Sequence, residues 1–213
     1  MPWMIDESYA WVEGPDPDLD AIAIAFVQYP GPFADVFGAS GNHWEAAERS
    51  TIDRVLHLVS GFDANREPLL IDRLGAWLVF LAANGFEFSY PGVAAGASRL
   101  GRVVSVFWNV NAVMRILVAD GGQVTRSFDP LIVDDAEGSP LPEEAGLPFG
   151  EPGKPRAASL VLAARLTGER LTRTWVFAEH DAVILRRRQW AADDPGCTAV
   201  VPLPRRGARE PGA

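Results

Sequence analysis

The sequence predicts an α+β fold in which helices pack on one face of a mainly antiparallel sheet. Two observations lead to this prediction. A β-meander runs from about residue 102 to 129, where three apolar or β-branched segments are separated only by tight-turn residues. On both sides of it, short strand-like runs alternate with segments of helical periodicity.

The turns define the meander. Asn109 to Asn111 interrupt the run between the first two strands, and Asp120-Gly121-Gly122 joins the second strand to the third. Asn, Asp and Gly adopt the positive φ angles that tight hairpin turns require. We therefore expect strands near 103–108, 113–118 and 123–128.

The other elements follow from apolar spacing and from Pro and Gly boundaries. Alternating Ile22 and Ile24 predict a buried strand over 21–29. Asn42 with Glu45 matches a capping box, which predicts a helix from about His43 to Ser60. The remaining expected elements are a helical turn at 33–38, one buried strand over 69–83, a short helix from Pro91 to Leu100, a helix from Arg156 to Leu171 and an edge strand within 174–185.

We expect one domain over residues 1–190, because 48% hydrophobic content in 213 residues is ample for a core. Within it, Leu131 to Pro155 is rich in Pro, Gly and acidic residues without periodicity, which predicts a loop outside the sheet. Pro and Arg dominate residues 191–213, which predicts a flexible tail.

The composition of the chain argues against several classes of protein. The single cysteine, Cys197, allows neither an intrachain disulfide nor a Cys-based zinc cluster. No apolar run approaches the roughly 20 residues of a membrane-spanning helix. The first residues are acidic and lack the basic start of a secretory signal, so a cytoplasmic location is expected.

Charge is unevenly distributed. The formal net charge is -9, which disfavours nucleic-acid binding. Residues 127–151 hold seven acidic residues and no Lys or Arg. Arg186 to Arg188 begin a basic end of the chain, which could meet RNA, a membrane surface or an acidic partner, or pair with the chain's own acidic segment.

A set of short motifs marks the central region: Trp77 before Asn84-Gly85-Phe86, Val103-Val104-Ser105-Val106, Asn109-Val110-Asn111-Ala112 and Ser127-Phe128-Asp129-Pro130. In this combination the chain, from about Ala21 to Leu171, resembles an uncharacterised actinobacterial family of unknown function. The resemblance implies an architecture and a lineage, but no reaction and no catalytic residues. The chain departs from the family pattern at Ala82-Ala83, where relatives carry Glu-Pro.

One candidate site lies at an end of the meander. Trp108, Asn109 and Asn111 could form a small polar pocket with an aromatic wall. Alternatively, the asparagines serve the turn by bonding their own backbone. A two-residue turn at Asp120-Gly121 would place Arg115 opposite Arg126, where like charges need an anion or a carboxylate of the chain between them.

The acidic segment is the second candidate. Asp129, Asp134, Asp135 and Glu137 could offer oxygen ligands to Mg²⁺ or Ca²⁺, but their spacing matches no calcium loop. Asp129-Pro130 also reads as the end of a strand. We therefore expect a solvated acidic surface without metal or other cofactor.

Catalytic and nucleotide-binding patterns are missing from the sequence. The three histidines lack metal-ligand spacing, Gly-x-Ser-x-Gly does not occur, and neither glycine-rich phosphate-binding pattern is present. We therefore expect a non-enzymatic cytoplasmic interaction module whose acidic segment binds a basic protein. An immunity or antitoxin role fits such a surface, because complementary charge speeds encounter with a toxin. The alternative is a small-molecule-binding protein or a hydrolytic enzyme with its polar site at the end of the meander.

Overall fold

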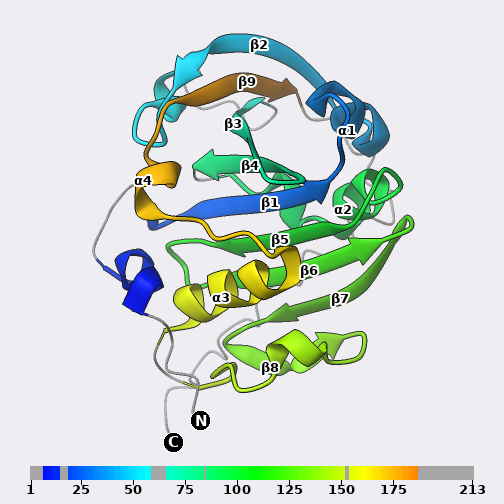
Figure 1. The fold of residues 1–213 in the computed structure, drawn as a ribbon, viewed down its shortest axis with the longest axis vertical. Coiled ribbons are helices and arrows are strands. Elements are labelled where there is room, and N and C mark those ends of the chain that lie inside the picture. The colour runs from blue at the N-terminus through cyan, green and yellow to red at the C-terminus, as the bar shows by residue number, and fades with distance from the viewer. Residues whose placement is uncertain (1–6, 15–18, 59–65, 84, 152–153, 187–213) are drawn as a thin grey trace, which may run out of the picture.

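An antiparallel sheet in the order β2-β9-β3-β4-β1-β5-β6-β7-β8 organises the chain (Figure 1). The computed structural model describes residues 7–14, 19–58, 66–83, 85–151 and 154–186. The strands in this part are β1 (Ile22–Gln28), β2 (His43–Ser50), β3 (Arg66–Leu74), β4 (Trp77–Ala83), β5 (Val103–Trp108), β6 (Met114–Asp120), β7 (Gln123–Asp129), β8 (Ile132–Glu137) and β9 (His180–Arg186). All their pairings are antiparallel, so the predicted α+β class and sheet type are confirmed.

The helices lie on both faces of the sheet, whereas the sequence-based expectation placed them on one. The α-helices are α1 (Phe33–Ser40), α2 (Pro91–Ala97), α3 (Pro155–Thr167) and α4 (Arg173–Val176). The described 3₁₀ helices are η1 (Glu7–Val12), η3 (Val55–Leu58), η4 (Glu87–Ser89) and η5 (Pro142–Glu144). Ile22 and Ile24 of β1 join the core beneath α3 and η1, and Ala23 and Ala25 join the core beneath α1 and α2. A strand covered on both sides is apolar at every position, as β1 is from 22 to 27.

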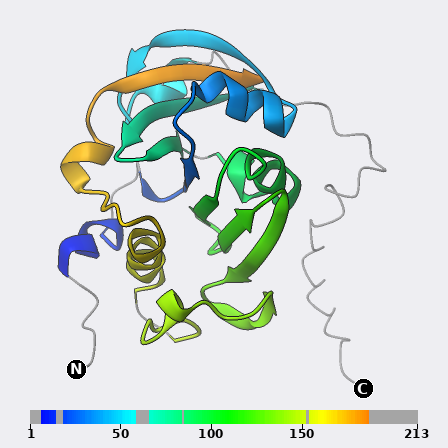
Figure 2. The same ribbon diagram turned by 45° about the vertical axis from the view of Figure 1, so that its right-hand side comes forward.

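The α3 helix is the main element of the first face. It lies in front of β5 and β6 in Figure 1, and Figure 2 shows η1 beside it. Pro155 occupies its first turn, and Gly168 ends it with φ of 75°. Its buried side chains include Ala157 and Leu160. The predicted helix is thus confirmed and ends four residues earlier than expected.

The meander is also confirmed, as β5, β6 and β7. The strand at 21–29, the helical turn at 33–38 and the short helix beginning at Pro91 likewise appear, as β1, α1 and α2. These elements were predictable because the residues that indicate them lie within or next to each element: Pro at a helix start, Gly or Asn at a turn, and a continuous apolar run.

The helix predicted from His43 to Ser60 is wrong. Residues 43–50 form β2, which pairs with β9 at least 130 residues later, and η3 follows after a turn. Trp44 packs edge-on against Phe33 of α1, with ring centroids 5.0 Å apart. Pairing with β9 and packing against α1 therefore override the local helix propensity of Glu45 to Arg49.

Three other predictions need correction. The single strand expected over 69–83 is a hairpin of β3 and β4, which turns at Gly75 with φ of 56°. The segment 131–155, expected outside the sheet, contributes β8 to it. The strand expected at the edge within 174–185 is preceded by α4 and becomes β9, which lies inside the sheet because β2 takes the edge.

The described strands belong to one sheet, and the prediction of a single domain up to residue 190 stays a prediction. The tail at 191–213 lies outside the described residues. No helix in the described ranges is both long and apolar enough to cross a membrane.

Candidate functional site

The side chain of Asn109 stabilises the turn between β5 and β6. The side-chain oxygen of Asn109 accepts hydrogen bonds from the backbone N–H groups of Asn111 (2.9 Å) and Val113 (3.1 Å). Asn111 itself is exposed. The orientation of the Asn109 amide is thereby fixed, with its oxygen toward the turn, so its NH₂ group remains available for other contacts.

Trp108 is anchored through its indole ring. Its side chain is buried, and its indole N–H donates to the Leu19 carbonyl at 2.6 Å. Trp108 therefore ties the end of β5 to the segment that enters β1.

The two predicted arginines are not opposite one another. Arg115 pairs with Phe107 across β5 and β6 and donates to the Ser89 carbonyl at 3.3 Å. Arg126 pairs with Val118, because a bulge next to Ala119 shifts the register and the hairpin turns at Gly121-Gly122. The expected Arg115–Arg126 pair is therefore wrong, because the bulge and the turn position were not readable from the sequence.

Arg126 instead meets a carboxylate of its own chain. Its Nε and Nη2 atoms each lie 2.8 Å from an oxygen of Glu144, in a two-point ion pair whose side chains are 5% and 12% exposed. Its Nη1 atom donates to the Gly138 carbonyl at 2.9 Å. Arg126 thus anchors the segment after β8 to β7, and one of the seven predicted acidic groups is neutralised.

Asp129 also has a structural role. One oxygen accepts from the backbone N–H of Leu131 at 2.8 Å, and the other accepts from that of Met114 at 3.3 Å. The carboxylate thus closes the tight connection from β7 to β8, in agreement with its predicted place at a strand end.

Asp134, Asp135 and Glu137 form the acidic edge, a name we use for these three residues of β8. All three are exposed, and within the described part of the chain none has an ion pair. Val133 and Ala136 of the same strand pack inward against the core. The acidic edge therefore faces solvent. Figure 1 shows β8 as the outermost strand at the bottom of the sheet.

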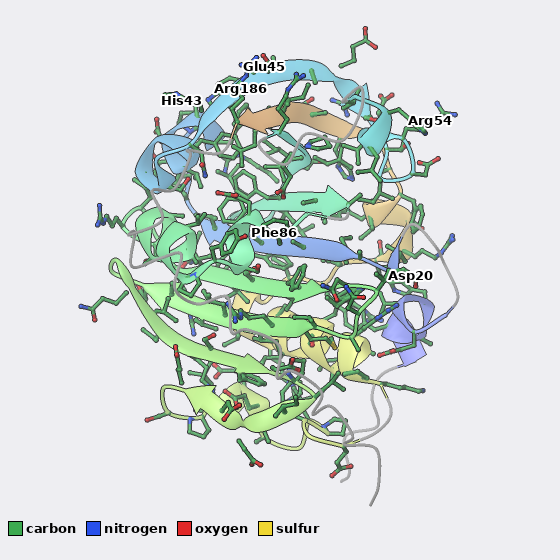
Figure 3. All side chains as sticks on the ribbon, turned by 180° about the vertical axis from the view of Figure 1, so that it is seen from behind. Asp20, His43, Glu45, Arg54, Phe86 and Arg186 are labelled. Atoms are coloured by element: carbon green, nitrogen blue, oxygen red, sulfur yellow. The ribbon has the colours of Figure 1, made fainter. Side chains whose placement is uncertain are left out.

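The basic end of the sheet does not meet this surface. Arg186 of β9 lies directly opposite Arg66 of β3, and Glu45 of β2 lies between them, at 3.0 Å and 2.5 Å (Figure 3 labels Glu45 and Arg186). The hydrogen bond from Arg186, and secondly that from Arg66, lowers the pKa of Glu45 below its ordinary value. The expected pairing of the basic cluster with the acidic segment is wrong for Arg186, and residues 187–190 lie outside the described residues.

A pocket of about 500 Å³ opens at the end of the meander where Asn109 lies. It is lined by Glu13, Gly14, Asp20, Trp108, Asn109, Ala112, Met114, Leu131, Pro155 and Arg156. Figure 3 shows Asp20 beside η1 at the entrance to β1. The pocket therefore joins three stretches of chain: the β5–β6 turn, the segment from η1 to β1 and the start of α3.

Backbone groups hold two of the three charged side chains of the pocket, Glu13 and Arg156. The Glu13 carboxylate accepts from the Ala157 N–H at 2.8 Å, at the positive end of α3. Arg156 donates to the Val12 carbonyl at 3.3 Å and lies 3.6 Å from Asp20. Its guanidinium also lies 5.7 Å from the centre of the Trp108 ring.

Sequence reasoning found Trp108 and Asn109 but missed Glu13, Asp20 and Arg156. These residues are separated by up to 143 positions, and no local spacing connects them. The other predicted residues are not among those that line the pocket: Asn111, Arg115, Arg126, Asp129 and the acidic edge.

The model of a family of unknown function, DUF6461, matches residues 69–180. This range exceeds half of the chain and contains the meander, β8 and α3. The chain belongs to this family. The expected membership of a family of unknown function is therefore confirmed. No curated protein and no solved structure matches the chain.

The range matched by DUF6461 contains one candidate site completely and the other in part. It contains the acidic edge and the Asn109 and Arg156 sides of the pocket, whereas Glu13 and Asp20 precede it. Among the residues described, no three His, Cys, Asp or Glu side chains are grouped as metal ligands.

A buried polar cluster lies on the opposite face of the sheet from α3. Glu87 of η4 is 1% exposed and Glu67 of β3 is 3% exposed. Asn42 donates to Glu87 at 2.6 Å, and Glu67 accepts from the Glu87 backbone N–H at 3.4 Å. Burial raises the pKa of Glu87 to about 7, although the Asn42 hydrogen bond opposes the shift.

His180 is a buried structural residue. Its Nδ1 atom lies 2.9 Å from an oxygen of Asp72, and its Nε2 atom lies 2.8 Å from the Trp175 carbonyl. Both ring nitrogens are therefore occupied by groups of the chain, which link β9 to β3 and α4.

Proposed function

We propose that the chain is a non-enzymatic cytoplasmic interaction module that binds a basic protein partner along β8. The observation that supports this proposal is the acidic edge: three exposed carboxylates on the outermost strand of the sheet. An immunity or antitoxin protein is the kind of module we have in mind, with a toxin of basic surface as its partner.

The strand itself supports a protein partner. An outermost strand has one row of backbone N–H and C=O groups without a neighbouring strand, and an extended segment of another chain can pair with that row. Ile132, at the start of β8, is 58% exposed and offers an apolar contact next to the carboxylates. Both features fit an extended segment that carries Lys or Arg.

The spacing of the carboxylates also favours a protein over a single ion. Asp134, Asp135 and Glu137 occupy three of four successive positions of β8, so their exposed carboxylates are spread along the strand. Carboxylates spread along a strand suit several cationic side chains distributed over a partner's surface. The net charge of -9 adds long-range attraction, which raises the rate of encounter with a basic protein.

Capture from a lysate of the native host tests the proposal. We expect the immobilised chain to retain a basic protein in stoichiometric amount at low salt and to release it as salt rises, because salt screens charges beyond about 10 Å at 0.1 M. The variant Asp134→Asn/Asp135→Asn/Glu137→Gln should lose this partner.

A matched control separates the acidic edge from net charge. The variant Glu48→Gln/Asp53→Asn/Asp120→Asn also removes three exposed negative charges, away from β8. It should retain the partner. Equal loss in both variants, or no stoichiometric basic protein with the unaltered chain, contradicts the proposal.

A further inference from the structure

We propose that the pocket at the end of the meander binds a small zwitterion, a molecule of α-amino-acid type that carries one carboxylate and one ammonium group. This site is distinct from the acidic edge and does not depend on the function proposed for it. It develops the alternative seen in the sequence, a polar ligand site next to Asn109.

First, the pocket has hydrogen-bond donors that are available to a ligand. Arg156 uses Nη1 for the Val12 carbonyl, and within the described residues its Nε and Nη2 atoms have no hydrogen-bond partner. Nε–H and one Nη2–H form an edge that fits the two oxygens of a carboxylate. Asn109 lines the same pocket, and because its amide oxygen accepts from the turn, its NH₂ group is the part of the side chain left to donate to a ligand.

The second step is the available acceptors. Glu13 uses one oxygen for the Ala157 N–H, and Asp20 lies 3.6 Å from Arg156, beyond a normal hydrogen bond. Each carboxylate therefore keeps oxygen capacity for a ligand N–H group. The Asp20 side chain is 47% exposed, so a ligand can reach it from solvent.

The balance of charge then selects the ligand. One guanidinium and two carboxylates give the lining a formal charge of about -1, which repels a phosphate dianion. A simple carboxylic acid would satisfy Arg156 and leave the two acidic groups without a partner. A zwitterion satisfies both sets, with its carboxylate at Arg156 and its ammonium at Asp20 and Glu13.

The remaining lining sets the size and polarity of the ligand. Ala112, Met114 and Leu131 supply apolar surface against which a small side chain can pack. A volume of about 500 Å³ lies in the range of pockets that bind small molecules.

Titrations followed by ¹⁵N-resolved NMR test the inference. The probes are the twenty common L-amino acids, added singly, with the N-acetyl derivative and the decarboxylated amine of each one that binds. We expect at least one amino acid to shift the amide signals of residues 109–114 and 156–157. The N-acetyl derivative and the decarboxylated amine should each bind at least about ten-fold more weakly than the parent amino acid.

Variants identify the groups involved. Arg156→Lys keeps the charge but loses the two-point edge, and Asp20→Asn removes an exposed carboxylate, so each should weaken binding about ten-fold or more. Arg99→Gln is the control, since Arg99 is exposed beside Gly122 at the other end of β6.

Asp20→Asn keeps the test informative if the Arg156 variant does not fold. The inference is overturned if no amino acid binds, if the acetylated or decarboxylated compounds bind equally well, or if Arg99→Gln weakens binding as much as the pocket variants.

Discussion

Glu87 shows at the level of one residue what burial does to a carboxyl group. Glu87 is 1% exposed, and its carboxyl group accepts a hydrogen bond from the Asn42 amide. The folded protein therefore holds the Glu87 proton to about pH 7, while the unfolded chain releases it near the ordinary value of 4.5. The residue links stability to pH.

Glu87→Gln should remove this link. Because the pKa is raised in the folded state, the stabilising contribution is complete below about pH 4.5 and is lost as pH rises toward 7. The loss amounts to about 3 kcal/mol, at about 1.4 kcal/mol per pKa unit. Relative to the unaltered chain, the variant should gain stability between pH 4.5 and 8, measured by urea unfolding.

Glu48→Gln is the matched control for this experiment, since Glu48 is exposed on β2. The difference in free energy of unfolding between Glu48→Gln and the unaltered chain should change little over the same pH range. A flat difference for Glu87→Gln as well would show that the Glu87 carboxyl is ionised in the folded protein at neutral pH.

Arg126 joins two elements, β7 and the segment that contains η5. Replacing it with Gln leaves the Glu144 carboxylate, 12% exposed, without its cation. Breaking such a pair from one side costs about 3 kcal/mol. We expect a loss of this size in the free energy of unfolding of Arg126→Gln, measured in urea, and a double variant with Glu144→Gln that loses less than the sum of the single variants.

The exposed pair of Arg49 and Glu179 provides the comparison, with side chains 57% and 63% exposed. Arg49→Gln should cost less than about 1 kcal/mol. Equal losses for Arg49→Gln and Arg126→Gln would mean that Arg126 does not anchor the segment.

Gly138 ends β8 at a point where no side chain fits. Its φ is 79°, and an added Cβ would lie 2.1 Å from the Thr125 carbonyl oxygen of β7. Gly138→Ala should therefore destabilise the protein by more than about 1 kcal/mol and increase hydrogen exchange of the β8 amides.

Gly168→Ala separates the clash from the backbone effect. Gly168 has a similar φ of 75°, but an added Cβ would meet nothing within 4 Å. Its substitution should cost less than that of Gly138. The reverse order would contradict the described packing of β8 against β7.

The limits of sequence reasoning are clearest for the strands at the two edges. The meander was predictable because Asn109 and the Asp120-Gly121-Gly122 turn lie between strands that pair with their neighbours in sequence. β2 was missed because its partner β9 lies at least 130 residues away, and because the exposed polar residues of β2 show no strand pattern. β8 was missed because edge strands are often charged, which makes them resemble loops.

The candidate sites divide in the same way. The acidic edge could be found because its three residues lie within four positions of one another. The pocket could not, since Asp20 and Arg156 meet only after α3 has packed on β5. The buried cluster of Asn42, Glu67 and Glu87 is likewise assembled by tertiary contacts alone.

At the scale of the whole molecule, the two edges of the sheet differ. β2 is tied to β9 and β3 through Glu45, whose carboxylate is paired with the guanidinium groups of Arg66 and Arg186. β8 carries the uncompensated acidic edge at the opposite end of the sheet, as Figure 1 shows. In the function that we propose, this asymmetry directs a basic partner to one side of the protein.

Hydrogen exchange of the backbone, with and without a short lysine-rich peptide, tests the role of β8 most directly. The account predicts slower exchange at residues 132–137 when the peptide is present, and no such change in Asp134→Asn/Asp135→Asn/Glu137→Gln. Protection at β2 in place of β8, or no protection of the unaltered chain, would contradict it.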